Sequence, residues 1–215
     1  MSNSPEMKGK IYTSVEKNIQ RYKNEFGQIS EERRKVLKDL AQFVEMKVKG
    51  GEKAELIFIC THNSRRSHIS QIWAQTAANY YAVPNVIAYS GGTEATAFNP
   101  RAVKAMEEAG FKIRKTTEST NPVYEVRFSD HATAIKAFSK KYDGDGNPQS
   151  GFGAIMTCSH ADQNCPVVGG ATVRITTPYD DPKDFDDTAQ EAEKYTERVH
   201  QIGREILYAF SLINV

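Results

Sequence analysis

Cys60, followed six residues later by Arg66 and then by Ser67, is the first feature of this sequence that predicts chemistry. A thiolate is a strong nucleophile, a guanidinium can grip two oxygens of a tetrahedral oxyanion, and a serine hydroxyl can donate a hydrogen bond to sulfur. The spacing therefore predicts a cysteine nucleophile beside an oxyanion site. The residues between them are Thr61, His62, Asn63, Ser64 and Arg65.

The elements around Cys60 are those that would position such a site. Residues 54–60 form a short apolar run typical of a buried strand, and residues 66–81 carry apolar side chains at helical spacing. A loop from a strand to a helix presents its backbone N–H groups to an anion, and this field also stabilises a thiolate. We therefore expect residues 61–66 to cradle an oxyanion facing Cys60. The simpler alternative is a buried strand cysteine beside a surface arginine.

The rest of the pattern indicates an α/β fold with a four-stranded parallel sheet and helices on both faces. Further strands are predicted over residues 86–89, 154–157 and 171–176, and further helices over residues 99–109 and 188–210. Ligands of such sheets bind beyond the carboxyl ends of the strands, where Cys60 falls.

Two segments extend this domain, which we place at residues 51–215. Residues 1–50 predict an N-terminal extension of two helices, and residues 116–151 an insertion with a hairpin over 123–128 and 135–138. One apolar stripe of the extension is expected to pack on the domain or on a second copy in a homodimer. That stripe consists of Leu37, Leu40, Phe43 and Val44.

Composition narrows the class of protein. The 215 residues are 39% apolar and 26% charged with a formal net charge of +1, which argues against nucleic acid or a membrane surface as partner. The chain has no apolar run near the ~18 residues of a membrane span and no signal-like N-terminus, so a soluble cytoplasmic protein is expected. Three cysteines in that compartment favour catalytic or redox thiols over a disulfide scaffold.

The stretch from Cys60 to Ser67 resembles the active-site loop of the low-molecular-weight protein tyrosine phosphatases and of the arsenate reductases that share their fold. The resemblance covers about residues 54–110 and 152–212. It implies Cys60 as nucleophile, Arg66 with the loop amides as oxyanion cradle, and Ser67 as support for the sulfur. His62 stands where the family has glycine, which would constrain the loop if that position needs a positive φ. Arg65 replaces a cysteine and is expected to be a solvated charge or an added attraction for oxyanions.

An acid is also expected, because the leaving oxygen of phosphate or arsenate must be protonated. Residues 178–182 follow the fourth predicted strand and so lie at the same sheet edge as Cys60. The family carries its acid in an Asp-Pro pair here, which maps onto Asp181 and Pro182. Asp180 is the competing acid, and a plain turn built by Asp and Pro is the alternative.

Cys158 and Cys165, seven residues apart with Pro166 following, resemble the redox segment of thioredoxin-coupled arsenate reductases. The resemblance implies that Cys60 is arsenylated, that Cys158 attacks and expels arsenite, and that Cys165 closes a disulfide reduced by thioredoxin. One alternative is a buried thiol with an unrelated loop cysteine. Another is a zinc site that includes His160, although the spacing fits no common zinc pattern.

These features predict an arsenate reductase that acts on arsenate or phosphate-ester substrates. The alternative enzyme is a phosphatase that hydrolyses phosphotyrosine through a phosphocysteine, and the non-enzymatic alternative is an adaptor for phosphoproteins. We expect no cofactor and no metal. Reductases of this family often bind potassium near the loop through acidic residues, and here Gln71 and Ser119 stand in the corresponding places.

Overall fold

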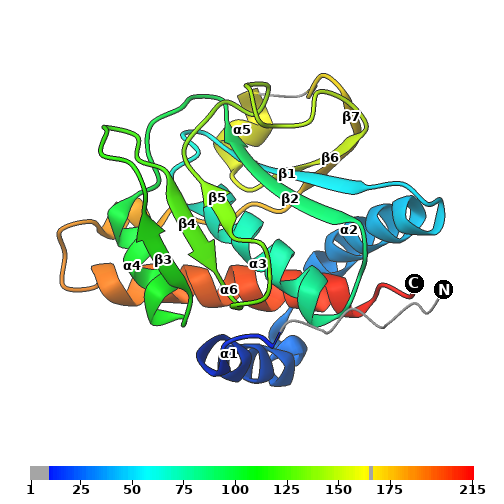
Figure 1. Ribbon diagram of the computed structural model, residues 1–215, viewed down its shortest axis with the longest axis horizontal. Coiled ribbons are helices and arrows are strands. Elements are labelled where there is room, and N and C mark those ends of the chain that lie inside the picture. Colours follow the sequence, from blue (N-terminus) through cyan, green and yellow to red (C-terminus); the bar gives the residue numbers. More distant parts are fainter. Residues whose placement is uncertain (1–9, 165–166) are drawn as a thin grey trace.

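A four-stranded parallel sheet forms the centre of the computed structural model, which describes residues 10–164 and 167–215 (Figure 1). The strand order is β2-β1-β6-β7, and all three pairings are parallel. This confirms the predicted sheet, although β2 and β6 are longer than the sequence indicated. The four strands are β1 (Ala54–Cys60), β2 (Val86–Gly92), β6 (Phe152–Met156) and β7 (Ala171–Thr176).

Helices cover both faces of this sheet, because alternate residues of a strand point to opposite sides. Leu56 and Phe58 of β1 belong to the cluster that includes α3 (Arg66–Tyr80) and α6 (Glu191–Ser211). Ile57 and Ile59 belong instead to the cluster that contains Ala161 of α5 (Ser159–Asn164). In Figure 1, α5 lies above the strands and α6 below them.

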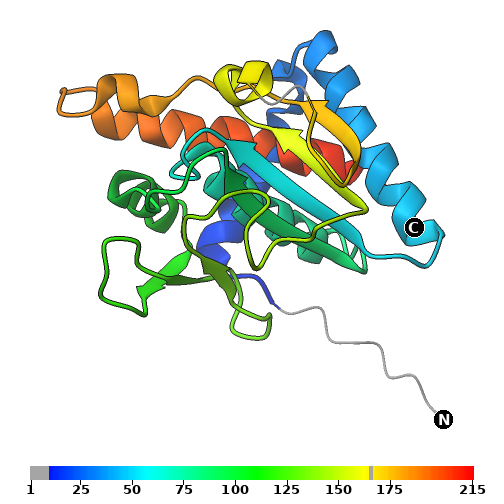
Figure 2. The same ribbon diagram turned by 90° about the horizontal axis from the view of Figure 1, so that it is seen from above.

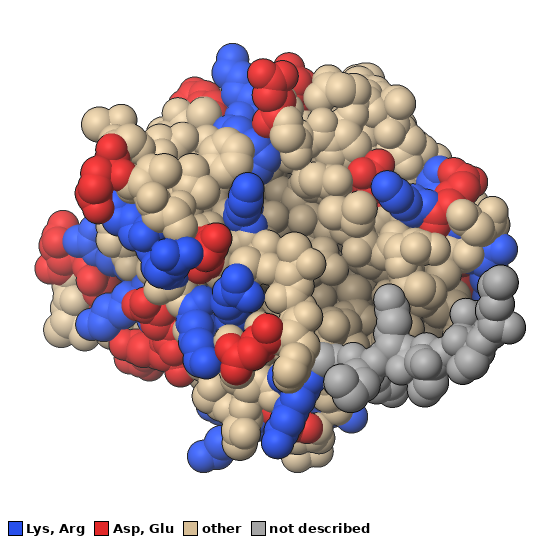
Figure 3. All heavy atoms as spheres, in the orientation of Figure 1, with Lys and Arg blue, Asp and Glu red and all other residues tan. Residues whose placement is uncertain are grey.

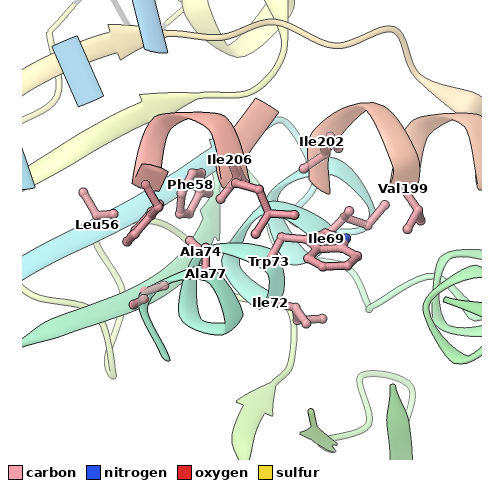
Figure 4. Close-up of a cluster of buried hydrophobic side chains, with 14 of the residues drawn as sticks. Leu56, Phe58, Ile69, Ile72, Trp73, Ala74, Ala77, Val199, Ile202 and Ile206 are labelled. Atoms are coloured by element: carbon pink, nitrogen blue, oxygen red, sulfur yellow. The ribbon is translucent and has the colours of Figure 1, made fainter. Parts of the chain in front are cut away.

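The larger core lies between the sheet, α3 and α6 (Figure 4). Trp73 of α3 is fully buried and lies among Ile202 and Ile206 of α6. Gly203 lets α6 come this close, because an added Cβ there would lie 2.8 Å from ring atoms of both Trp73 and Tyr22. The apolar residues that recur at helical spacing in α3 and α6 are therefore the residues that face this core.

The N-terminal helices join the same core. They are α1 (Thr13–Asn24) and α2 (Glu31–Lys49), with a 3₁₀ turn η1 (Phe26–Gln28) between them. The side chain of Ser30 caps α2 by accepting a hydrogen bond from the backbone N–H of Arg33 at 3.2 Å. Tyr22 of α1 meets Trp73 edge to face at 5.4 Å between ring centroids. The stripe of Leu37, Leu40, Phe43 and Val44 is at most 4% exposed, so it packs within its own chain.

A second, antiparallel sheet has the order β3-β4-β5 and lies to one side of the main sheet (Figure 2). The predicted hairpin is confirmed by β4 (Tyr124–Arg127) and β5 (Ile135–Ala137). The sequence did not indicate β3 (Lys112–Lys115), because three of its four residues are charged and it has no apolar run. The remaining elements are α4 (Pro100–Glu108), capped by Asn99, and the 3₁₀ turn η2 (Pro182–Phe185). The last helix begins at Glu191 rather than near Thr188.

Figure 3 shows how charged side chains are distributed over one face of the molecule. On the side drawn in Figure 3, basic and acidic side chains are intermixed. In the described part of the chain, no helix has the length and apolar character needed to cross a bilayer.

Candidate active site

Cys60 is the last residue of β1 and lies at the start of a loop that its own residues hold together. Its side chain is 3% exposed, and its Sγ lies 3.1 Å from Ser67 Oγ at the first turn of α3. Asn63 Nδ2 donates to the same Ser67 Oγ at 2.9 Å. Because Ser67 Oγ accepts a hydrogen bond from Asn63, the hydroxyl hydrogen of Ser67 is free to be donated to the sulfur of Cys60. Such a hydrogen bond stabilises a thiolate.

The backbone of this loop turns at Asn63, whose φ is 43°. Asparagine tolerates the left-handed region better than most residues, so no glycine is needed there. His62 does not have a positive φ, so the lack of glycine at that position does not constrain the loop. Gly92, at the end of β2, packs against the loop so closely that a Cβ would lie 2.7 Å from both Asn63 N and Thr61 O.

The insertion braces this loop from the other side. Ser139 Oγ donates to the carbonyl of His62 at 3.0 Å, and the backbone N–H of Lys140 donates to Asn63 Oδ1 at 2.8 Å. Residues 140–142 are fixed in turn by Gly92, which donates to Lys140 O and accepts from Tyr142 N, both at 2.9 Å. Sequence reasoning missed these contacts, since nothing in the local pattern marks Ser139 or Lys140.

Two buried titratable side chains lie behind the loop. His68 is fully buried, with its Nδ1 3.1 Å from Ser90 Oγ; burial and then the charge of Lys140 lower its pKa to about 3. Lys140 is 9% exposed, and burial lowers its pKa to about 8. At neutral pH the imidazole is therefore uncharged, while the nearby ammonium keeps most of its charge.

Arg66 and Asp181, which the sequence singled out separately as oxyanion ligand and acid, form an ion pair. Arg66 Nη2 donates to Asp181 Oδ2 at 2.6 Å, and its Nη1 donates to the carbonyl of Tyr179 at 2.9 Å. Asp181 Oδ1 accepts from the backbone N–H of Lys183 and so caps η2. The structure thus brings the loop after β7 to the helix that follows Cys60.

Arg65 differs from its expected role as a solvated charge. Its residue is only 8% exposed, its Nε donates to Tyr195 Oη at 3.0 Å, and its Nη1 lies 3.7 Å from Asp181 Oδ1. The solvated-charge alternative is wrong because the sequence pattern does not show that Tyr195 of α6 lies against the loop, whereas an added attraction for oxyanions stays a prediction. Arg65 therefore links α6 to the carboxylate of Asp181.

The remaining acidic and loop candidates lie as follows. Asp180 has a 95% exposed side chain, and its Oδ2 lies 3.5 Å from Arg198 Nη2. His62 is half-exposed and lies 3.6 Å from a carboxylate oxygen of Glu94. Ser64 is buried, and its carbonyl accepts the backbone N–H of Asn99.

The structure places Cys158 beside the same loop. Its thiol is free and 1% exposed, and its Sγ lies 3.5 Å from the hydroxyl of Thr61, the residue after Cys60. The same hydroxyl lies 3.2 Å from His160 Nδ1. Cys165 lies outside the described residues. Cys158 thus lies against the residue that follows Cys60, and both cysteines belong to the same buried cluster.

Gln71 and Ser119, which stand at the positions of potassium ligands in similar reductases, lie in different parts of the structure. Gln71 Nε2 donates to the carbonyl of Ala88 in the core, and Ser119 is exposed on the insertion. Over residues 10–164 and 167–215 there is no group of three or more His, Cys, Asp or Glu side chains placed to hold a metal ion.

Comparison with known proteins places this site among enzymes. No model of a known protein family matches the chain. An arsenate reductase of Bacillus cereus is 28% identical over 153 residues, which cover 70% of this chain and 95% of that protein. An arsenate reductase of Bacillus licheniformis is 29% identical over 155 residues, or 72% of this chain and 93% of that protein.

Solved structures give matches of lower identity. A low-molecular-weight phosphotyrosine phosphatase of Vibrio cholerae matches with 12% identity and a TM-score of 0.48, covering 72% of this chain and 93% of its own. A thioredoxin-dependent arsenate reductase of Corynebacterium glutamicum matches with 19% identity and a TM-score of 0.43, covering 82% and 72%. The sequence relatives confirm the resemblance indicated by Cys60–Ser67. The chain is similar in sequence to arsenate reductases of two Bacillus species.

Proposed function

We propose that the chain is an enzyme that reduces arsenate, with Cys60 as its nucleophile. One observation carries the proposal: a second thiol, Cys158, lies against Thr61, the residue that follows Cys60. Hydrolysis of a phosphate ester at Cys60 needs only water to regenerate the thiolate, whereas reduction needs a neighbouring thiol. The named function of the Bacillus relatives supports the same reaction.

In the first step, the Cys60 thiolate attacks arsenic. An S–As bond forms and an As–O bond breaks, and the leaving oxygen departs as water once Asp181 has protonated it. Ser67 supports the sulfur, and Arg66 with the loop amides holds the remaining oxygens. Arsenate competes with Asp181 for the guanidinium of Arg66, because both are anions. Once arsenate has displaced it from Arg66, the carboxyl group of Asp181 lies next to a dianion, and a neighbouring negative charge favours the protonated form of a carboxyl group.

In the next steps the oxidation passes from Cys60 to Cys158 and then to Cys165. Cys158 as a thiolate attacks the sulfur of Cys60; an S–S bond forms, the S–As bond breaks, and its electron pair leaves with arsenic as arsenite. Cys165 as a thiolate then attacks Cys158, forms the Cys158–Cys165 disulfide and releases the Cys60 thiolate. The role of Cys165 follows from its seven-residue spacing and from the family resemblance.

The cycle closes when an external dithiol reduces the Cys158–Cys165 disulfide. We propose a protein of the thioredoxin class, the reductant named for the Corynebacterium glutamicum enzyme. Such a cycle needs a compartment that keeps thiols reduced, which is the cytoplasm.

The test is one turnover of arsenate without reductant. We expect one equivalent of arsenite and a Cys158–Cys165 disulfide, located by mass spectrometry after alkylation. Cys60→Ser should give neither product. Cys165→Ser should stop at a Cys60–Cys158 disulfide, and it should lose turnover with thioredoxin.

Phosphotyrosine hydrolysis is the rival function, because phosphate has the shape and charge of arsenate. An aryl phosphate assay separates the two. If arsenate leaves all three thiols reduced while the aryl phosphate is hydrolysed briskly and Cys165→Ser is fully active, the chain is a phosphatase and the reductase proposal is wrong.

A further inference from the structure

Cys158 must lose its proton before it can act as a nucleophile, and the first steps proposed above leave that proton without a destination. The thiol is 1% exposed, so bulk water is a poor acceptor for it. In reactions of this kind the thiolate, and not the thiol, attacks. A group inside the protein that accepts the proton would therefore complete the site.

The hydroxyl of Thr61 connects Cys158 to such a group. Thr61 Oγ1 lies 3.5 Å from Cys158 Sγ on one side and 3.2 Å from His160 Nδ1 on the other. Thr61 is 8% exposed, whereas His160 is exposed at the surface. The three polar atoms thus form a chain from a buried thiol to an imidazole that can exchange protons with water.

The hydrogens of this chain can run in one consistent direction. A threonine hydroxyl has one hydrogen, so when it donates to His160 Nδ1 its oxygen is left to accept the S–H of Cys158. This assignment places the hydrogen of a neutral imidazole on Nε2. We propose that His160, acting through the Thr61 hydroxyl, takes the proton of the Cys158 thiol; this inference rests on the proposed arsenate reduction.

The proton transfer is balanced. The S–H bond of Cys158 breaks as Thr61 gains that hydrogen, and Thr61 gives its own hydrogen to His160 Nδ1. No electron pair leaves the sulfur, and the products are a thiolate and an imidazolium. The imidazolium then donates back to Thr61, whose hydroxyl donates to the sulfur; the backbone N–H of Ala161, 3.3 Å from Cys158 Sγ, donates as well.

The other ionisable groups around Cys158 are less suited to the task. Asp162 of α5 accepts hydrogen bonds from Arg174 and Thr176 of β7. Cys60 of β1 forms a hydrogen bond with Ser67, and its sulfur is the atom that Cys158 attacks. Strand β6 carries no titratable side chain. Tyr142 packs against the same cluster, but a phenol is a far weaker base than an imidazole. An imidazole is also suited to the task because a general base works best when its pKa lies near the working pH, and imidazoles as a class titrate near neutral pH.

The experiment titrates the Cys158 thiol directly. In a chain carrying Cys60→Ser and Cys165→Ser, thiolate ultraviolet absorbance is followed against pH, with the same chain lacking Cys158 as blank. His160→Asn keeps a hydrogen-bonding group near the Nδ1 position but removes the base. We expect it to lower the thiolate fraction near neutral pH by about tenfold, with full recovery in alkali. Thr61→Val should reproduce this loss, and Thr61→Ser should restore the parent titration.

Two outcomes would overturn the inference. One is a His160→Asn titration that superimposes on the parent curve, and the other is an equal loss at every pH, which would indicate a structural role for His160. A separate arm measures arsenite release in a single turnover by the chain with all three cysteines. There His160→Asn should slow formation of the Cys60–Cys158 disulfide but not the first attack on arsenate. If the parent releases no arsenite, the proposed function fails while the titration still decides the role of His160.

Discussion

Asp180 and Asp181 are adjacent in the chain but differ in what surrounds them. Asp181 accepts a 2.6 Å hydrogen bond from Arg66, whereas the side chain of Asp180 is 95% exposed and lies nearest to Arg198. A general acid must stand within reach of the leaving oxygen, and the oxygens are expected at Arg66. The surroundings therefore favour Asp181 over the alternative left open by the sequence.

Asp181→Asn should lower kcat for arsenate reduction by about 10²–10⁴, because an amide cannot protonate the leaving oxygen. Binding of phosphate, measured by calorimetry, should hold or strengthen, since Arg66 loses its competing carboxylate. Asp180→Asn is the matched control and should keep kcat. Large damage from the control with a harmless Asp181→Asn would move the acid to Asp180.

Lys140 gives a pH-dependent prediction for stability. Burial lowers its pKa to about 8 from an ordinary 10.5, so below pH 8 both folded and unfolded chains hold the proton and folding buries a charge. As pH rises from 8 towards 10.5, the folded chain releases the proton first, and this cost disappears. Lys140→Met should therefore stabilise the fold below pH 8 by about 1–3 kcal/mol.

Urea unfolding across that pH range measures the effect. The advantage of Lys140→Met should shrink steadily between pH 8 and pH 10.5. Exposed Lys141 offers a matched control, and Lys141→Met should change the free energy of unfolding little at any pH. A gain from Lys140→Met that is the same at all pH values would exclude the buried charge as its cause.

At the scale of elements, α6 packs closely against α1 and α3 because the residue at the contact, Gly203, has no side chain. An added Cβ at Gly203 would lie 2.8 Å from Trp73 Cε2 and from Tyr22 Cε2, which is closer than real Cβ contacts come. The two rings are fully buried and touch one another, so neither can move aside easily.

Gly203→Ala should lower the free energy of unfolding by about 1–3 kcal/mol through overpacking, despite the better helix propensity of alanine. Gly27 is the matched control, because an added Cβ there meets nothing within 4 Å. Denaturant unfolding of both variants tests the claim. A Gly203→Ala protein as stable as the Gly27→Ala protein would show that the three helices can separate at little cost.

At the scale of the whole molecule, the N-terminal helices α1 and α2 share one core with the sheet. Val15, Ile19 and Tyr22 of α1 are fully buried, as are Leu37 and Val44 of α2. Burying side chains of this size contributes roughly 1.5–3 kcal/mol each, so the gross contribution of these five residues is comparable to a typical domain's net stability.

Deletion of residues 1–50 should therefore give an aggregating or unfolded protein, because it exposes the apolar side of α3 and α6. Circular dichroism and size-exclusion chromatography of the shortened chain measure this. Point variants provide a milder comparison: Leu37→Ala should cost about 2–5 kcal/mol, and exposed Lys38→Ala less than about 0.5 kcal/mol. A shortened chain that stays monomeric, stable and active would contradict the shared core.

The sequence by itself determined the features that depend on local pattern. Residues 54–60 and 171–176 became β1 and β7 with the predicted bounds. For β1 the reason is local, since a strand buried along nearly its whole length needs little but an apolar run. Asn99 before Pro100 began α4 where it was expected, because a cap acts on its own first turn. The spacing from Cys60 to Ser67 likewise predicted their contact, which spans a single loop.

Only the tertiary structure decided the contacts between distant segments. Ser139 and Lys140 reach His62 and Asn63 across 77 residues of chain, and Arg65 reaches Tyr195 across 130. The hydroxyl of Thr61 meets Cys158 and His160 from 97 and 99 residues away. No periodicity or turn signal encodes such pairs, because they depend on which sheet edge, insertion and helix end the topology brings together. The local sequence thus set the positions of Cys60 and its loop, and the fold set the groups that surround them.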